Sequence, residues 1–147
     1  MKEVHLAVGV LAIALNAAAA LLGTWRWWRH EQTAWFWRVL RAGQAAVVVQ
    51  VALGGILVLI GDKPKGLHVI YGLLPLLVSL IAEQLRGASA QMVLDARGFE
   101  SAQDVGRLPE EEQRGVVAAI LRRELGVMTL AAWVVVVLLL RAAQTAG

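Results

Sequence analysis

Long apolar runs alternate with short polar segments along the chain. Four runs hold few charged residues, and they cover residues 6–22, 39–60, 67–82 and 125–140. Each run approaches or reaches the roughly 20 residues that a helix needs to cross the hydrocarbon core of a bilayer. The shorter runs gain length from flanking residues, which can snorkel or allow tilting. The pattern therefore predicts four membrane-spanning helices.

The composition agrees with this pattern. Of the 147 residues, 59% are hydrophobic and 17% are charged, and the mean hydropathy is +0.64. This is too apolar for a soluble domain, and the length suits one domain. We predict an all-α integral membrane protein, an up-down bundle of four transmembrane helices with a short cytoplasmic helical extension. The expected spans are 4–23, 39–60, 67–85 and 117–141, and the expected cytoplasmic connection is 86–116.

The arginines predict the orientation in the membrane, because cytoplasmic loops are enriched in Lys and Arg. Two loops carry most of them: Arg26, Arg29, Arg38 and Arg41 in the first, and Arg86, Arg97, Arg107, Arg114, Arg122 and Arg123 before the last span. The other side holds Lys2, Lys63, Lys65 and Arg141. We therefore expect a multi-pass protein of the plasma membrane with both termini extracytoplasmic.

Five tryptophans accompany the first basic loop: Trp25, Trp27, Trp28, Trp35 and Trp37. They are typical of the aromatic belt at a membrane interface, and a nucleic-acid or ligand surface is the less favoured interpretation. The isoelectric point near 10.0 does not change this, because the arginines lie beside membrane spans. We expect no nucleic-acid partner.

The connection before the last span has the features of a helical hairpin. Pro109 suits a first helical turn, and Glu110, Glu111 and Glu112 complement the positive end of the helix dipole. We expect a helix that begins there and continues into the fourth span, with the hairpin broken near residues 98–106.

Two histidines occupy matching places in the expected bundle. His5 lies in the first turn of the first span and His68 in the first turn of the third. Alternate helices of an up-down bundle are parallel and lie diagonally across the core, so the imidazoles are expected to face each other at similar depth. Such a pair suits axial ligation of a heme iron from opposite faces, at about 2 Å from each nitrogen. Because the chain has no cysteine, covalent c-type attachment is excluded, and the expected cofactor is heme b.

Small and basic residues surround this pair. Gly9 and Gly72 each follow a histidine by four residues, on the same helix face, and Gly54 is expected at similar depth. These glycines are candidates to leave room for a porphyrin, although helix packing is an alternative role. Further candidates, for binding the heme propionates, are Lys2, Lys65 and Arg141, for which an ordinary interfacial role remains open.

The stretch VVVQVALGGILVLIGDKPKGLHVIYGLL resembles the heme A synthase family, in which a Q-x-x-L-G-G helix precedes a short outer loop and a histidine-bearing helix. The match is carried by Gln50, Leu53, Gly54, Gly55 and His68. The resemblance implies one four-helix half of such an enzyme, the half that binds heme b as a redox cofactor. The glutamate that precedes the first histidine by one helical turn in the family's catalytic half is not matched, because position 2 is Lys2.

Two classes of function follow. The first is a bis-histidine heme b protein that transfers electrons near the outer face, with membrane lipid around it. Candidate partners are a quinone, a redox protein, a second copy of the chain or a respiratory complex. If the protein is an enzyme, the resemblance implies a heme A synthase-like oxidoreductase, and no catalytic residue is assigned. The alternative is a non-heme membrane scaffold or accessory subunit of a respiratory complex.

Overall fold

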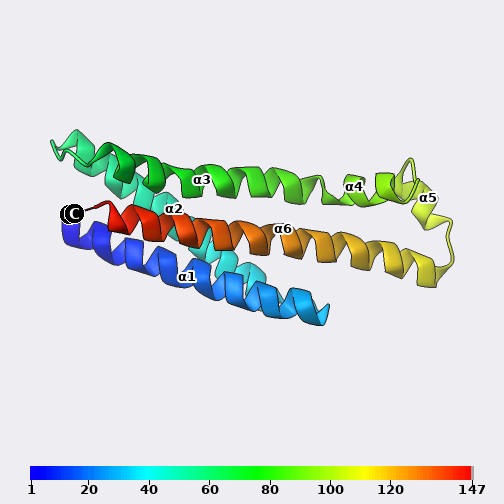
Figure 1. The fold of residues 1–147 in the computed structure, drawn as a ribbon. Helices are drawn as coiled ribbons and strands as arrows, with labels where there is room; N and C mark the ends of the chain where they lie inside the picture. The colour runs from blue at the N-terminus through cyan, green and yellow to red at the C-terminus, as the bar shows by residue number, and fades with distance from the viewer. Residues whose placement is uncertain (147) are drawn as a thin grey trace.

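Six helices follow one another along residues 1–146, the part of the chain that this computed structural model describes (Figure 1). They are α1 (Lys2–Arg29), α2 (Ala34–Leu59), α3 (Gly66–Gly87), α4 (Ser89–Ala96), α5 (Ala102–Gly106) and α6 (Glu110–Gln144). No strand occurs among these residues. Four of the helices, α1, α2, α3 and α6, are long and apolar enough to cross a membrane.

The four long helices alternate in direction, and the two ends of the described chain lie at the same end of the molecule (Figure 1). Helix α6 lies between α1 and α3 and packs extensively against both. Helix α1 also packs along α2, whereas α2 and α3 have a smaller contact. Helices α1 and α3 are therefore on opposite sides of α6.

Small residues allow this close packing. Ala12, Ala19 and Ala20 of α1 are fully buried. A Cβ atom on Gly23 would lie 2.2 Å from the Oγ1 atom of Thr129 and 2.6 Å from the ring of Phe36. Helices that share an apolar solvent gain their association energy from such close van der Waals contacts. Gly23 is consequently a point of direct contact between α1, α2 and α6.

Beyond α1 and α2, the end of α3, helices α4 and α5 and the first turns of α6 form a projecting hairpin (Figure 1). Its turn uses Gly98, whose φ of 75° suits glycine. Pro109 caps α6, with three glutamates in the first turn of that helix.

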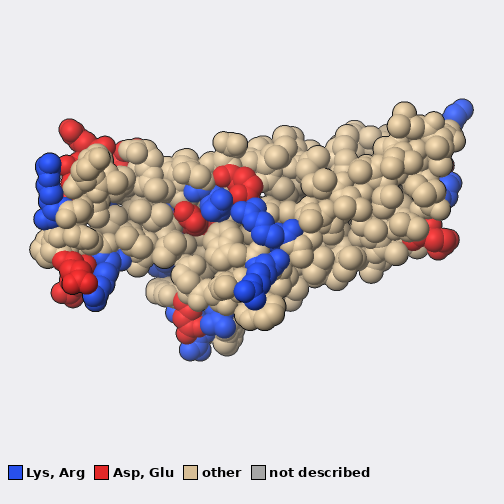
Figure 2. All heavy atoms as spheres, turned by 180° about the vertical axis from the view of Figure 1, so that it is seen from behind, with Lys and Arg blue, Asp and Glu red and all other residues tan. Residues whose placement is uncertain are grey.

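Charged side chains are unevenly distributed along the molecule. In the view from behind, they gather at both ends and in a belt partway along, and the face between the belt and the end with the termini is almost uncharged (Figure 2). On α1, no charged residue lies between Glu3 and Arg26, a rise of about 34 Å at 1.5 Å per residue. That length matches a hydrocarbon core of about 30 Å.

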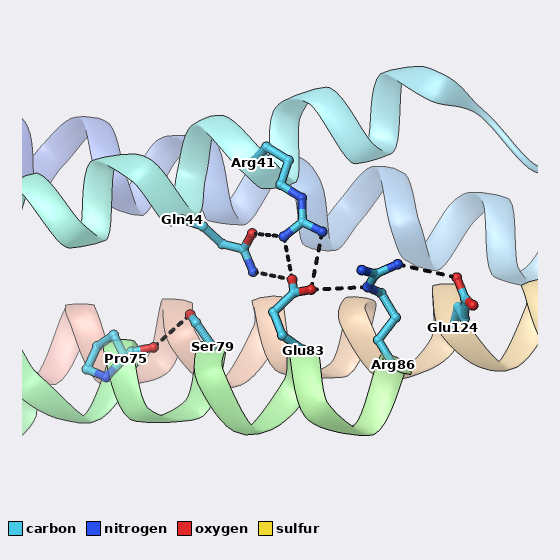
Figure 3. A network of polar contacts seen from close by, with 7 residues as sticks. All are labelled: Arg41, Gln44, Pro75, Ser79, Glu83, Arg86 and Glu124. Atoms are coloured by element: carbon cyan, nitrogen blue, oxygen red, sulfur yellow. Dashed lines mark hydrogen bonds and ion pairs between the residues drawn. The ribbon is translucent and has the colours of Figure 1, made fainter. Parts of the chain in front are cut away.

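A network of charged and polar side chains joins three helices (Figure 3). Glu83 of α3 accepts hydrogen bonds from two residues of α2, Arg41 and Gln44. The bond from Nε2 of Gln44 is 3.0 Å long. Arg86 donates to Glu83 at 3.1 Å and lies 3.7 Å from Glu124 of α6. The network connects α2, α3 and α6 at the level where the uncharged face ends.

Candidate functional site

His5 and His68 come together at the end of the molecule that carries the termini. Their ring centroids lie 6.2 Å apart, with an angle of 67° between the ring planes. The first turns of α1 and α3 place the two side chains, and both are partly buried. Among the described residues, no group of three or more His, Cys, Asp or Glu is placed to hold a metal ion.

His68 is oriented by the last turns of α6. Its Nδ1 atom lies 2.9 Å from the carbonyl oxygen of Ala142. A carbonyl oxygen only accepts, so Nδ1 carries the proton and donates. Within residues 1–146, Nε2 of His68 has no hydrogen-bond partner. A backbone carbonyl on one ring nitrogen that leaves the other free is the usual arrangement of a metal-binding histidine.

His5 is oriented differently, toward α2. Its Nε2 atom lies 3.1 Å from the side-chain nitrogen of Gln50. An amide nitrogen only donates, so Nε2 of His5 is the acceptor and the proton is on Nδ1. That Nδ1 atom is buried without a hydrogen-bond partner, as is Oε1 of Gln50. Two buried polar atoms are therefore unsatisfied beside the histidine pair, at a cost of roughly 1–3 kcal/mol for each.

The glycines near the pair differ in what surrounds them. A Cβ atom on Gly9 would lie 2.9 Å from Nε2 of Gln50, so the Gln50 side chain occupies the place expected for a porphyrin edge. A Cβ atom on Gly54 would lie 3.3 Å from the His5 ring. Gly72 has no heavy atom within 4 Å of its Cβ position. Of these three glycines, only Gly72, on the His68 side, has open space at its Cβ position.

The expected propionate-binding residues make contacts with the protein itself. Lys2 Nζ lies 2.9 Å from Oδ1 of Asp62 in the loop between α2 and α3. Arg141 donates to Gln144 at 3.1 Å, and its guanidinium lies 5.7 Å from the centre of the Tyr71 ring. Lys65 immediately precedes α3 and caps it. All of these residues lie at the end of the molecule that holds the histidine pair.

The Lys2 contact has a consequence for Asp62. The hydrogen bond from the Lys2 ammonium lowers the pKa of the Asp62 carboxyl below its ordinary value, and partial burial opposes this effect. The Lys2 side chain is exposed and that of Asp62 is partly exposed, so the pair fixes the loop locally and contributes little to global stability.

Some polar residues within the long helices form interhelical hydrogen bonds. Gln44 and Glu83 bond to each other, and Gln50 contacts His5. Asn16 bonds within its own helix instead, since its Nδ2 atom donates to the Ala12 carbonyl at 2.8 Å. His30 lies at the other end of α1, where it caps the helix with a φ of 59°. It is far from the pair.

Sequence reasoning missed the role of Asp62 and the position of the Gln50 side chain. The first is detectable only as a carboxylate in an otherwise basic loop. The second has no local signal, because it depends on how α2 is rotated against α1. Comparisons of the chain with family models, with curated proteins and with solved structures found no match.

Proposed function

We propose that this chain is a four-helix membrane protein that holds a heme b between His5 and His68 and takes part in electron transfer near the outer face. The separation of the two imidazoles carries the proposal. Two iron–nitrogen bonds of about 2 Å, with about 1 Å from each nitrogen to its ring centre, give centroids about 6 Å apart. The 6.2 Å between His5 and His68 fits that arrangement.

The residues fit the cofactor on one side and require a rearrangement on the other. His68 has the tautomer and the free Nε2 atom that an axial ligand needs. His5 has to turn away from Gln50 so that Nε2 faces His68, and the Gln50 side chain has to leave the space beside Gly9. The unsatisfied Nδ1 of His5 and Oε1 of Gln50 favour this change, because both atoms are without partners in the present arrangement.

When bound, a bis-histidine heme accepts and donates single electrons without binding a further ligand. The chain's own residues would hold it and set its surroundings. His68 keeps its orientation through Ala142, and Gly72 leaves space beside the ligand. Lys65 and Arg141 supply positive charge at that end for the propionates, and Lys2 would join them by leaving Asp62. We propose a quinone or a redox protein as the electron partner.

The membrane arrangement is part of the same proposal. We infer an up-down bundle of α1, α2, α3 and α6 in the plasma membrane, with both termini outside and the α4–α5 hairpin in the cytoplasm. The uncharged rise of about 34 Å on α1 and the positive-inside rule support it. Reporter fusions at the C-terminus should behave as extracytoplasmic, and fusions within residues 98–106 as cytoplasmic. The reverse pattern would contradict the orientation.

The heme site is tested by titrating the purified full-length protein with hemin. We expect saturation at one heme per chain, with release of the cofactor into acid acetone because no cysteine attaches it. The variant His5→Ala/His68→Ala should bind no heme at the same concentrations. Equal binding by this double variant would show that the histidine pair is not the site.

One observation favours a second candidate function, a non-heme scaffold or accessory subunit. The Gln50 side chain fills the space beside Gly9 and contacts His5, as expected if these residues serve only to pack α1 against α2. In that case Gln50→Leu should leave the spectrum of hemin-treated protein unchanged. If the heme site exists, this variant, which frees Nε2 of His5, should bind hemin more tightly than the original chain.

A further inference from the structure

A hollow of about 750 Å³ lies at the other end of the membrane-length region, where the end of α1 meets α4 and the middle of α6. Trp27 and His30 line it from α1, Val93 from α4, and residues 118–130 of α6 provide most of the remaining wall. A smaller hollow of about 330 Å³ shares Trp27, His30 and Arg122 with it. The two hollows therefore adjoin at these three residues.

The rim of the larger hollow is basic and unpaired. Arg122 and Arg123 both line it, and no Asp or Glu does. Within residues 1–146, neither arginine forms an ion pair with a carboxylate, and Arg123 contacts the sulfur of Met92 at 2.9 Å. Other arginines of the same belt are neutralised, as Arg86 is by Glu83 and Glu124. The rim therefore carries positive charge without a partner.

The floor of the hollow is apolar and is built around a glycine. A Cβ atom on Gly126 would lie 3.2 Å from the Trp27 indole, so the indole lies directly on the backbone of α6. Leu125, Val127 and Leu130 continue the floor toward the uncharged part of the molecule. The two arginines thus lie at one end of this hollow, and an apolar surface extends from them toward the uncharged part of the molecule.

We infer that this hollow binds an anionic phospholipid, with the phosphate at Arg122 and Arg123 and an acyl chain along Leu125 and Leu130. Basic pockets at the cytoplasmic side of membrane helices bind acidic lipid head groups, and tryptophan favours the same interface. The inference rests on the membrane insertion proposed above and does not depend on the histidine pair.

Native mass spectrometry of the full-length protein in detergent tests this inference. We expect phosphatidylglycerol to remain bound in preference to phosphatidylcholine with the same acyl chains. The variant Arg122→Gln/Arg123→Gln should lower the affinity for phosphatidylglycerol about thirtyfold, from roughly fivefold for each arginine near an anionic lipid. Ala118→Trp, which fills the hollow without changing charge, should also lower it.

The matched control is Arg38→Gln/Arg97→Gln, which removes the same charge from sites outside the hollow and should retain the lipid. Equal retention of the two lipids, or an equal loss in the control variant, would overturn the inference. So would displacement of the lipid by an equal concentration of glycerol 3-phosphate, because a soluble anion would then be the ligand. None of these measurements uses heme absorbance. The lipid-binding result can therefore be interpreted even if the protein binds no heme.

Discussion

The imidazole of His68 donates from Nδ1 to the backbone carbonyl of Ala142 at 2.9 Å, which joins the first turn of α3 to the end of α6. This bond fixes the tautomer of His68 and leaves Nε2 free. The corresponding nitrogen of His5 contacts Gln50 instead. The two histidines are therefore unequal, since Nε2 is free in His68 and hydrogen-bonded in His5.

Substitution of either histidine should remove low-spin heme ligation. His5→Ala and His68→Ala should each abolish the low-spin absorption bands, because one strong axial nitrogen remains in each variant. His30→Ala is the control, since His30 caps the far end of α1. A low-spin spectrum that persists in both alanine variants would exclude this pair as the ligands.

The glycine beside His68 should matter for the cofactor and not for the fold. Gly72→Leu places a side chain in space that is open in the structure, so the bundle should remain folded while the heme is displaced. Gly87→Leu is the matched control on the same helix, because its Cβ position is equally open and lies at the opposite end. Hemin titration measures the heme affinity of both variants. An equal loss of affinity in the two would count against the site.

Gly23 should be sensitive for a different reason. Gly23→Ala forces a Cβ atom to within 2.2 Å of Thr129 and 2.6 Å of Phe36, and overpacking of this kind costs about 1–3 kcal/mol. In contrast, Gly115→Ala meets no atom within 4 Å and should stabilise α6 by about 0.5–1 kcal/mol. Thermal unfolding in detergent compares the stabilities of the two variants with that of the original protein. A Gly23→Ala protein as stable as the original would show that the helices are not packed in this way.

The lowered pKa of Asp62 predicts a pH dependence in the loop between α2 and α3. A carboxyl whose folded pKa is lowered contributes its stabilisation above the ordinary value of 3.8 and loses it as the pH falls through the lowered pKa. The protection of the amide protons at residues 2–6, measured relative to the intrinsic exchange rate at each pH, should therefore fall on acidification below that value. Asp62→Asn should lower this protection at neutral pH as well. Identical exchange in the two proteins at neutral pH would mean that the Lys2 contact does not hold α1.

The helices themselves were predictable, because four apolar runs and the Pro109 cap are local features. The predicted spans 4–23, 67–85 and 117–141 each lie within one helix, and 39–60 extends one residue beyond α2. The rotation of each helix was not predictable. In a helix that is apolar on all sides, the residues that face lipid resemble those of the core. The contact between Gln50 and Gly9 and the burial of Gly23 both depend on that rotation.

The most direct measurement is the visible absorption spectrum of the full-length protein, purified after expression with ample heme. We expect a red protein with a low-spin spectrum, from two axial imidazoles, and about one heme per chain. A colourless preparation, or a high-spin spectrum unchanged by His5→Ala, would contradict the proposed heme site.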